Sequence, residues 1–196
     1  MTDAISLRDT LITSGLALLE EGGSQGLTLR KAAARAGVSH AAPAHHFAGL
    51  PGLLTAMAGR AFALFHHAME VQIEAAPNTP RARLEATCQG YLDFAAQHAG
   101  LFHLMFVSPE VNRADPEILP HSGRAYQLLR EACLPFSATA NPDVTLEIAV
   151  WSMVHGFATL GFLGGIDRAR PIPEPPNFNA CLGRLVMPDA FPTAAA

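Results

Sequence analysis

Hydrophobic residues recur at helical spacing along most of the chain, and no segment sustains the period-two alternation of a half-buried strand. Leu7, Leu11 and Leu18 define the first stripe, which Gly22 and Gly23 end because glycine is costly inside a helix and suits its C-terminal end. We therefore expect an all-α fold. The expected helices span residues 6–21, 29–36, 40–47, 51–75, 81–97, 101–107, 116–135, 142–164 and 177–187.

The composition permits a sizeable core and excludes several classes of protein. Of the 196 residues, 49% are hydrophobic and 15% are charged, against a usual charged share of about 25%, so intrinsic disorder is excluded. A net charge of −4 excludes a generally basic nucleic-acid coat protein, although not a local DNA-binding surface. The sequence has no 18-residue apolar span, no apolar signal core at its N-terminus and no metal-like spacing of its three cysteines. We expect a soluble, reduced, cytoplasmic protein without a membrane segment.

The segment Thr28–Phe47, TLRKAAARAGVSHAAPAHHF, has the pattern of two short helices joined by a turn that contains glycine. The small alanines of the first helix permit close packing, and Gly37 can adopt the left-handed conformation that such a turn needs. Val38 would fill the angle between the helices, and Ser39 would cap the second one. The pattern predicts a helix-turn-helix whose second helix enters the DNA major groove, although it also fits an ordinary helical hairpin.

The sequence around this segment resembles the N-terminal domain of the TetR (tetracycline-repressor-like) family of transcriptional regulators, from Ile12 to Leu54. The matching motifs are Thr28-Leu29-Arg30-x-Ala32-Ala33, Ala36-Gly37-Val38-Ser39, His46-Phe47 and Leu53-Leu54. Further along, Trp151 and His155-Gly156 resemble the signature of members with a Trp-His-Gly type of ligand domain. The resemblance implies a three-helix helix-turn-helix DNA-binding domain at 1–50, a linker helix at 51–75, and a helical ligand-binding and dimerisation domain at 76–196.

The function that this resemblance implies is a ligand-responsive, DNA-binding transcriptional regulator of bacterial type. It would act as a homodimer on a palindromic operator in double-stranded DNA, and as a repressor released by an apolar or aromatic small-molecule effector. The residues expected to contact DNA are Thr28, Arg30, Lys31, Ser39, His40, Ala42, Pro43, His45 and His46.

Two departures from the family pattern weaken the expected DNA contact. Ala44 stands where the family usually has Tyr, and Leu50 where it usually has Lys; both family residues resemble phosphate contacts. Residues 1–60 hold five basic and four acidic side chains, a net charge of +1, whereas residues 61–196 hold eight and thirteen, a net charge of −5. An alternative therefore stays open: a helical small-molecule or protein-binding module with a TetR-like fold that has lost operator binding.

The C-terminal region has apolar and aromatic residues with few polar groups, a composition typical of a pocket for an apolar or aromatic molecule and also of plain core packing. The expected ligand-binding residues are Phe65, Phe94, His98, Phe102, Met105, Phe106, Tyr126, Trp151 and His155. His155-Gly156 also fits a helix-packing device, with glycine allowing close approach. The expected last two helices are more apolar than one core requires, so we assign them to a dimer interface through Ala149, Met153, Phe157, Leu160, Leu182 and Leu185.

Enzymatic and metal-binding motifs are not found in the sequence. It contains no Gly-x-Ser-x-Gly, phosphate-loop or Gly-x-Gly-x-x-Gly pattern, and its single lysine is Lys31. The adjacent pairs His45-His46 and His66-His67 point in different directions around a helix, and no second ligand cluster accompanies them. We therefore expect no catalytic site, no cofactor and no bound metal.

Overall fold

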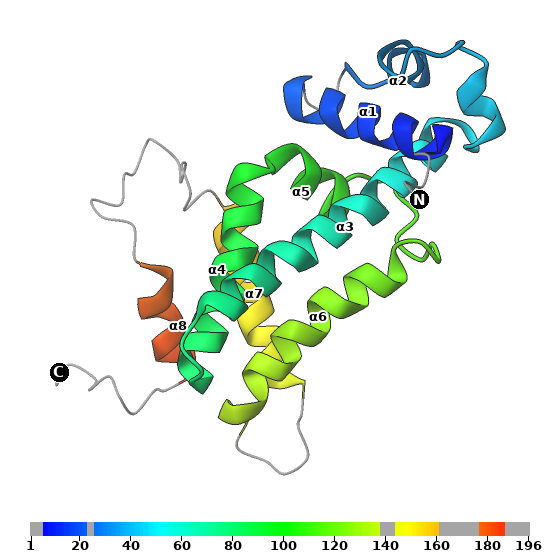
Figure 1. Ribbon diagram of the computed structural model, residues 1–196. Coiled ribbons are helices and arrows are strands. Elements are labelled where there is room, and N and C mark those ends of the chain that lie inside the picture. Colours follow the sequence, from blue (N-terminus) through cyan, green and yellow to red (C-terminus); the bar gives the residue numbers. More distant parts are fainter. Residues whose placement is uncertain (1–5, 23–25, 138–143, 161–176, 187–196) are drawn as a thin grey trace, which may run out of the picture. The chain divides into compact units, whose positions relative to one another are not determined.

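The computed structural model describes residues 6–22, 26–137, 144–160 and 177–186, which form helices joined by turns (Figure 1). The all-α expectation is confirmed for these ranges. The α-helices are α1 (Leu7–Gly22), α2 (Leu29–Arg35), α3 (Gly49–Ala75), α4 (Pro80–Gln97), α5 (Ala99–Phe106), α6 (Leu119–Cys133), α7 (Thr145–Thr159) and α8 (Phe178–Val186), and the short 3-10 helices are η2 (Ala42–His45) and η3 (Leu134–Phe136). The predicted start of the penultimate helix at residue 142 and its predicted end at residue 164 lie outside the described residues.

The chain packs as two compact units, and each unit combines two segments that are separated in the sequence. Unit 1 comprises residues 1–66 and 97–125, and unit 2 comprises residues 67–96 and 126–196. Helices α3, α4 and α6 therefore each contribute residues to both units. This division by packing differs from the sequence-based division at residues 50 and 75, because residues 97–125 pack with the N-terminal segment.

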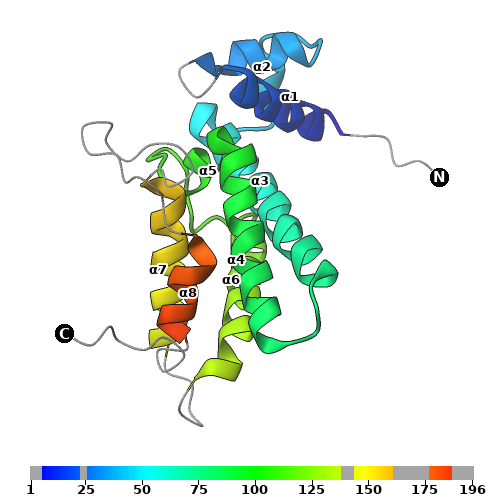
Figure 2. The ribbon, with the colours of Figure 1, turned by 90° about the vertical axis from the view of Figure 1, so that its left-hand side faces the viewer.

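Unit 1 is organised around α1, which packs against both α2 and α5. Figure 2 shows α1 and α2 lying side by side. Leu11 and Leu19 of α1 and Leu53 and Met57 of α3 are fully buried and form the centre of this core. A Cβ atom on Gly15 would lie 2.7 Å from the Met57 sulfur, so Met57 of α3 packs directly over this glycine of α1, and a larger residue there would require the Met57 side chain to shift.

Unit 2 is built from α4, the C-terminal part of α3, most of α6, α7 and α8. A Cβ atom on Gly90 of α4 would lie 2.6 Å from the Cα of Met69, so glycine permits backbone-to-backbone contact between α4 and α3. Helices α7 and α8 pack side by side (Figure 2), with the rings of Phe157 and Phe178 edge to face at 5.0 Å. Asn177 caps α8 as predicted, because its Oδ1 accepts the Asn179 N–H at 2.8 Å.

The segment after the first helix of the predicted helix-turn-helix differs from expectation. An α-helix was expected over residues 40–47, whereas the structure has turns and the single 3-10 helix η2. Pro43 has no N–H to donate to the carbonyl of Ser39, which instead accepts the Ala42 N–H at 3.0 Å, one residue closer. The expected cap by the Ser39 side chain is also wrong, since η2 begins after Ala41 and has no side-chain cap.

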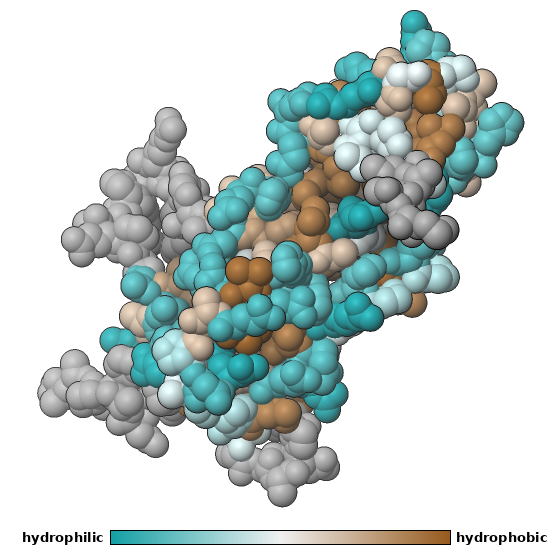
Figure 3. All heavy atoms as spheres, viewed as in Figure 1, coloured by the Kyte–Doolittle hydropathy of each residue, from teal (hydrophilic) through white to brown (hydrophobic). Residues whose placement is uncertain are grey.

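Several large hydrophobic side chains are exposed on helix surfaces. Leu64 and Val71 of α3 are 43% and 47% exposed, and Figure 3 shows hydrophobic surface among polar neighbours along this helix. These residues are spaced singly, which is ordinary for a folded protein. Within the described ranges, no helix combines the length and the apolar character needed to cross a membrane.

Candidate functional site

The first half of the predicted helix-turn-helix has the expected local geometry. Thr28 adopts an extended conformation, φ −140° and ψ 155°, and its hydroxyl accepts the Lys31 N–H at 3.1 Å, which caps α2. Ala32 and Ala33 are completely buried, as close packing of this helix requires. Gly37 has φ +71°, so the expected left-handed glycine of the turn is confirmed.

Most of the residues expected to contact DNA lie on the surface of this hairpin. Those classed as exposed are Thr28, Arg30, Lys31, Ser39, His40, His45 and His46. Ala42 is half-buried, and Pro43 is buried beneath η2. The expectation that Pro43 faces a base is therefore wrong for this conformation, because its ring packs inward and fixes the 3-10 turn.

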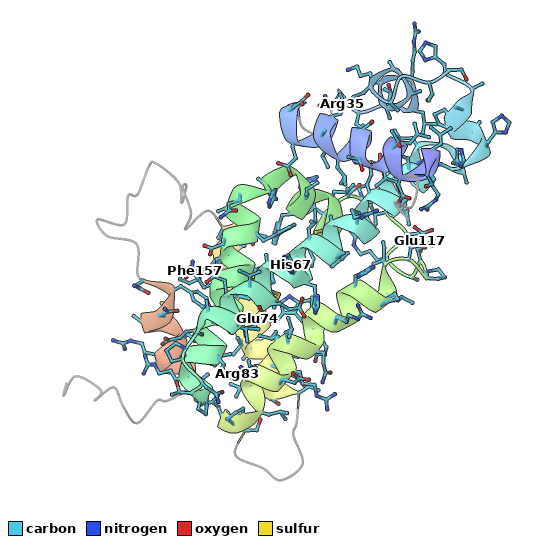
Figure 4. All side chains as sticks on the ribbon, viewed as in Figure 1. Arg35, His67, Glu74, Arg83, Glu117 and Phe157 are labelled. Atoms are coloured by element: carbon cyan, nitrogen blue, oxygen red, sulfur yellow. The ribbon has the colours of Figure 1, made fainter. Side chains whose placement is uncertain are left out.

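Ion pairs neutralise most of the basic side chains in the first 60 residues. Arg35 donates two hydrogen bonds to the carboxylate of Glu21, at 2.6 and 2.7 Å, and these raise the pKa of Arg35 and lower that of Glu21. Arg8 pairs with Glu117 at 2.7 Å, and Arg60 pairs with Asp9 at 3.1 Å; Figure 4 labels Arg35 and Glu117. Arg30 and Lys31, at the start of α2, remain as the exposed positive charges of the hairpin.

The expected ligand-binding residues fall into two groups, one in each unit. In unit 1, Phe65, Phe102 and Phe106 form an aromatic cluster, with ring centroids 4.8 Å apart for Phe102–Phe106 and 6.0 Å for Phe65–Phe106. The sequence analysis missed Phe62, whose ring meets that of Phe106 edge to face at 5.6 Å. Phe62 lies one helical turn before Phe65, and this spacing could have predicted that both rings lie on the same face of α3.

Two further expected ligand residues of unit 1 have clear structural roles. Met105 is completely buried. His98 precedes α5, and its Nδ1 lies 3.2 Å from Oε1 of Glu20 in α1. The contact of His98 with Glu20 links α5 to α1, which packs against α2 of the predicted helix-turn-helix.

In unit 2, the side chains of Trp151, Tyr91 and His155 form a relay, that is, a chain of two hydrogen bonds. The Tyr91 hydroxyl lies 2.6 Å from Nδ1 of His155, and the Trp151 side chain is hydrogen-bonded to Tyr91. Because an indole N–H can only donate, the Tyr91 oxygen accepts from Trp151 and donates its own proton to His155. Burial raises the pKa of Tyr91 and lowers the pKa of His155, so both groups are held neutral, as this direction of donation requires.

Beside this relay lies a buried carboxylate that the sequence analysis did not select. Glu147 is only 4% exposed and is hydrogen-bonded to Tyr126, whose ring lies 5.4 Å from that of Trp151. Glu147, Trp151 and His155 follow one another at intervals of four residues, which places them on one face of α7. The four-residue spacing to Trp151 could have predicted from the sequence that Glu147 lies beside these residues. Tyr91 comes from α4, and no nearby sequence pattern indicates its contact with His155.

Phe94 and Gly156 lie in different surroundings. Phe94 is 2% exposed on α4 and belongs to the core of unit 2. No described atom lies within 4 Å of a Cβ built on Gly156, so the idea that this glycine permits close helix packing is wrong for the single chain.

Unit 1 contains an apolar cavity of about 180 Å³. It is lined by residues of α1, the start of α3 and the region around α5, namely Leu19, Leu27, Leu50, Leu54, Gly100, His103, Leu104, Ser108, Pro109 and Glu110. None of these is an expected ligand-binding residue. Leu50, one of the two departures from the family pattern, therefore forms part of an apolar wall.

The expected dimer-interface residues divide into surface and core positions. Leu160 is 63% exposed and Leu185 is 37% exposed, while Ala149, Met153 and Phe157 are half-buried. Leu182 is 1% exposed within the single chain, so its assignment to an interface with another chain is wrong, because it packs in the core of unit 2. Ile148 of α7, which the sequence analysis did not select, is 46% exposed.

The described part of the chain also contains cysteines and other potential metal ligands. Among the described residues, no three His, Cys, Asp or Glu side chains come together as metal ligands. Cys88 and Cys133 are free and buried, and burial raises the pKa of both thiols, to about 12 for Cys133. Thiols held neutral in this way are poor nucleophiles.

The hairpin of unit 1 is followed in the chain by a larger helical region, and both belong to an all-helical fold. Residues 84–180 match the family model described as "Tetracyclin repressor-like, C-terminal domain", and the fold is that of TetR family regulators. The more specific Trp-His-Gly type stays a prediction. Among curated proteins, none matches the chain significantly.

Solved structures are similar over nearly the whole chain. A protein described as of unknown function from Rhodococcus sp. RHA1 is 27% identical, with a TM-score of 0.70 over 96% of this chain and 94% of that one. The TetR family transcriptional regulator PfmR from Thermus thermophilus is 21% identical, with a TM-score of 0.59 over 94% and 97%. The TetR-like transcriptional regulator LfrR from Mycobacterium smegmatis, solved with proflavine, is 18% identical, with a TM-score of 0.59 over 96% and 99%.

Proposed function

We propose that this chain is a ligand-responsive DNA-binding transcriptional regulator. It binds a palindromic operator as a homodimer, represses transcription, and is released by an apolar or aromatic small molecule. The observation that carries the proposal is the hairpin of α2, Gly37 and η2, which has a capped first helix, a left-handed glycine and a polar exposed surface on a TetR-like fold. The complex of the similar regulator LfrR with proflavine supports the aromatic class of effector.

The contacts of α5 supply a route from ligand to DNA within unit 1. A Cβ on Gly100 would lie 3.2 Å from the Leu19 carbonyl oxygen, and His98 of the same turn contacts Glu20, so the start of α5 rests directly on α1. A ligand beside Phe102 and Phe106 that shifts α5 would thus shift α1 and the hairpin. The effect is limited to the difference in ligand affinity between the two states, about 1.4 kcal/mol for a tenfold change, and operator DNA must weaken ligand binding by the same factor.

The proposal is tested by a gel-shift titration of the full chain against the DNA upstream of its own gene, at two salt concentrations. We expect specific binding that weakens with salt, and the variant Lys31→Ala should reduce the slope of log affinity against log salt by about 0.9 for one lost phosphate contact. Arg83→Ala is the matched control, since it removes an exposed arginine of α4 in unit 2 (Figure 4). Failure of the chain to bind this DNA, or equal effects of the two variants, would contradict the proposal.

The alternative function is a small-molecule or protein-binding module without operator binding. One observation favours it: the segment expected to read the major groove is a four-residue 3-10 helix, and its exposed Ala44 cannot make the phosphate contact of a tyrosine. A chain of this kind would bind ligand normally and bind DNA only weakly and without sequence preference. The gel shift with specific and unrelated competitor DNA separates the two functions.

A further inference from the structure

Glu147 is a buried acidic group whose side chain is incompletely satisfied. It lies in the first turn of α7 and is 4% exposed, and its Oε2 has no hydrogen-bond partner among the described residues. Removing a carboxylate from water costs several kcal/mol unless it is paired or hydrogen-bonded. The partial positive charge at the start of α7 offsets part of this cost but leaves the Oε2 atom without a donor.

The groups that face Glu147 do not supply the missing positive charge. Tyr126 is hydrogen-bonded to it and has its pKa raised by burial and by the Glu147 charge. The Cys133 thiol nearby is also held neutral, since burial and Glu147 raise its pKa to about 12. Among the described residues, the cation that acts on Tyr126 is Arg130, which is itself exposed.

Aromatic rings flank this carboxylate and remain partly accessible. The rings of Tyr126 and Trp151 lie 5.4 Å apart at 46°, and both side chains are only half-buried. Trp151 is held in place because its N–H donates to Tyr91, which in turn donates to His155. A fixed indole, a phenol and an unsatisfied carboxylate are the groups that recognise an organic cation, through its charge on the ring faces and an N–H to the carboxylate.

We propose that Glu147, Tyr126 and Trp151 form a recognition site for an aromatic ligand that carries one cationic nitrogen. The aromatic body of the ligand contacts the two rings, and its ammonium group donates a charge-assisted hydrogen bond to Oε2 of Glu147. This inference goes beyond the ligand position proposed beside Phe102 and Phe106 in unit 1: it assigns a second ligand site, in unit 2, to aromatic cations. It rests on the proposed function only for the regulatory consequence of binding.

The sequence contains a single tryptophan, Trp151, so intrinsic fluorescence excited at 295 nm reports from the site itself. Three probes share the biphenyl body and differ in the charge of the substituent: 4-biphenylmethylamine is a cation at neutral pH, 4-biphenylmethanol is neutral, and 4-biphenylacetate is an anion. Each is titrated into the DNA-free full chain. We expect the cation to bind at least tenfold more tightly than the alcohol, and the anion to bind more weakly than both.

The variant Glu147→Gln keeps the shape of the side chain and removes its charge. It should lose the tenfold preference for the amine over the alcohol. Glu74→Gln is the matched control, since Glu74 is an exposed carboxylate of the same unit (Figure 4), and it should retain the preference. If Glu147→Gln does not fold, Tyr126→Leu replaces it and should also reduce affinity for the amine, through loss of the ring and of the hydrogen bond.

Equal affinity for amine and alcohol, or a preference that survives Glu147→Gln, would overturn the proposal. Absence of binding by all three probes would overturn it as well. A gel shift with the same protein preparations keeps this result separate from the proposed function. Intact operator binding without cation binding removes only the inference about Glu147, whereas loss of operator binding in the unaltered chain removes the regulator itself.

Discussion

At the scale of single residues, the pair Tyr91–His155 couples the stability of unit 2 to pH. Tyr91 donates to Nδ1 of His155, and burial lowers the pKa of that histidine below its ordinary value near 6.5. The unfolded chain therefore binds the proton more readily than the folded chain as pH falls below 6.5. Stability must rise with pH across this window, since the unfolded state holds more protons there.

The prediction is that the free energy of unfolding decreases more between pH 7.5 and pH 5 in the unaltered chain than in His155→Gln. Urea denaturation at several pH values measures this difference. His67→Gln serves as the control, because 72% of the His67 side chain is exposed (Figure 4), and it should follow the unaltered chain. Parallel pH profiles for the unaltered chain and His155→Gln would contradict the assignment of a neutral His155.

Ala44 gives a second prediction at this scale. It is exposed on η2, where a tyrosine would point into solvent or toward a phosphate. Ala44→Tyr should therefore tighten DNA binding, and to a similar extent for operator and unrelated DNA, because phosphate contacts position a protein without reading sequence. Gel shifts on both kinds of DNA measure the effect. Unchanged affinity in a chain that does bind DNA would mean that η2 is not placed against the backbone.

The conformation or contact of a single residue could be predicted from the sequence where neighbouring residues in the chain determine it. The Thr28 cap and the left-handed Gly37 follow from the chemistry of one turn and were predicted correctly. The role of Pro43 was wrong because its missing N–H mattered more than the helical pattern around it. Tyr91 could not be predicted, since it reaches His155 from another helix 64 residues away.

At the scale of helices, Gly90 fixes how closely α4 approaches α3. A Cβ there would lie 2.6 Å from the Cα of Met69 and 2.8 Å from the Ala68 carbonyl oxygen, and backbone atoms cannot rotate away. Gly90→Ala should lower the free energy of unfolding by about 1–3 kcal/mol through overpacking. Thermal unfolding should show a melting temperature several degrees lower, at roughly 2–4 °C per kcal/mol for a chain of this size.

Gly123 of α6 is the matched position, because no neighbouring atom of the described residues lies within 4 Å of a Cβ built there. Gly123→Ala should stabilise the chain by roughly 0.5–1 kcal/mol, since alanine loses less backbone entropy than glycine in a helix. Equal effects of the two substitutions would show that α3 and α4 are not in backbone contact. The helices themselves were predictable from periodicity and from Gly and Pro, but the close approach at Gly90 depends on a partner that periodicity does not identify.

At the scale of the whole molecule, the exposed apolar side chains of α7 and α8 are the positions through which two chains are expected to form a dimer. Leu160, Ile148 and Leu185 are 63%, 46% and 37% exposed, whereas Leu182 on α8 is buried. A hydrophobic stripe in a sequence does not distinguish a core within one chain from an interface between two chains. This is why Leu182 was assigned to the wrong class while Leu160 and Leu185 remain candidates for the dimer interface.

Leu160→Glu should convert a dimer into a monomer at micromolar concentration, because a charged group would be buried at the interface. Leu119→Glu is the control, since Leu119 is 54% exposed and belongs to α6 in unit 1. Analytical ultracentrifugation of the three proteins measures the change. A monomer for the unaltered chain, or a dimer that tolerates Leu160→Glu, would remove this interface from the account.

The proposed function requires a dimer of this chain to bind a specific two-fold symmetric DNA site. Selection of bound duplexes from a random-sequence pool tests it directly, because the pool contains every candidate operator sequence. We predict enrichment of an inverted repeat whose half-sites are one helical turn of DNA apart, about 34–36 Å, or a multiple of that spacing. A pool that stays random after repeated rounds, or that converges on a site without two-fold symmetry, would contradict the proposed function.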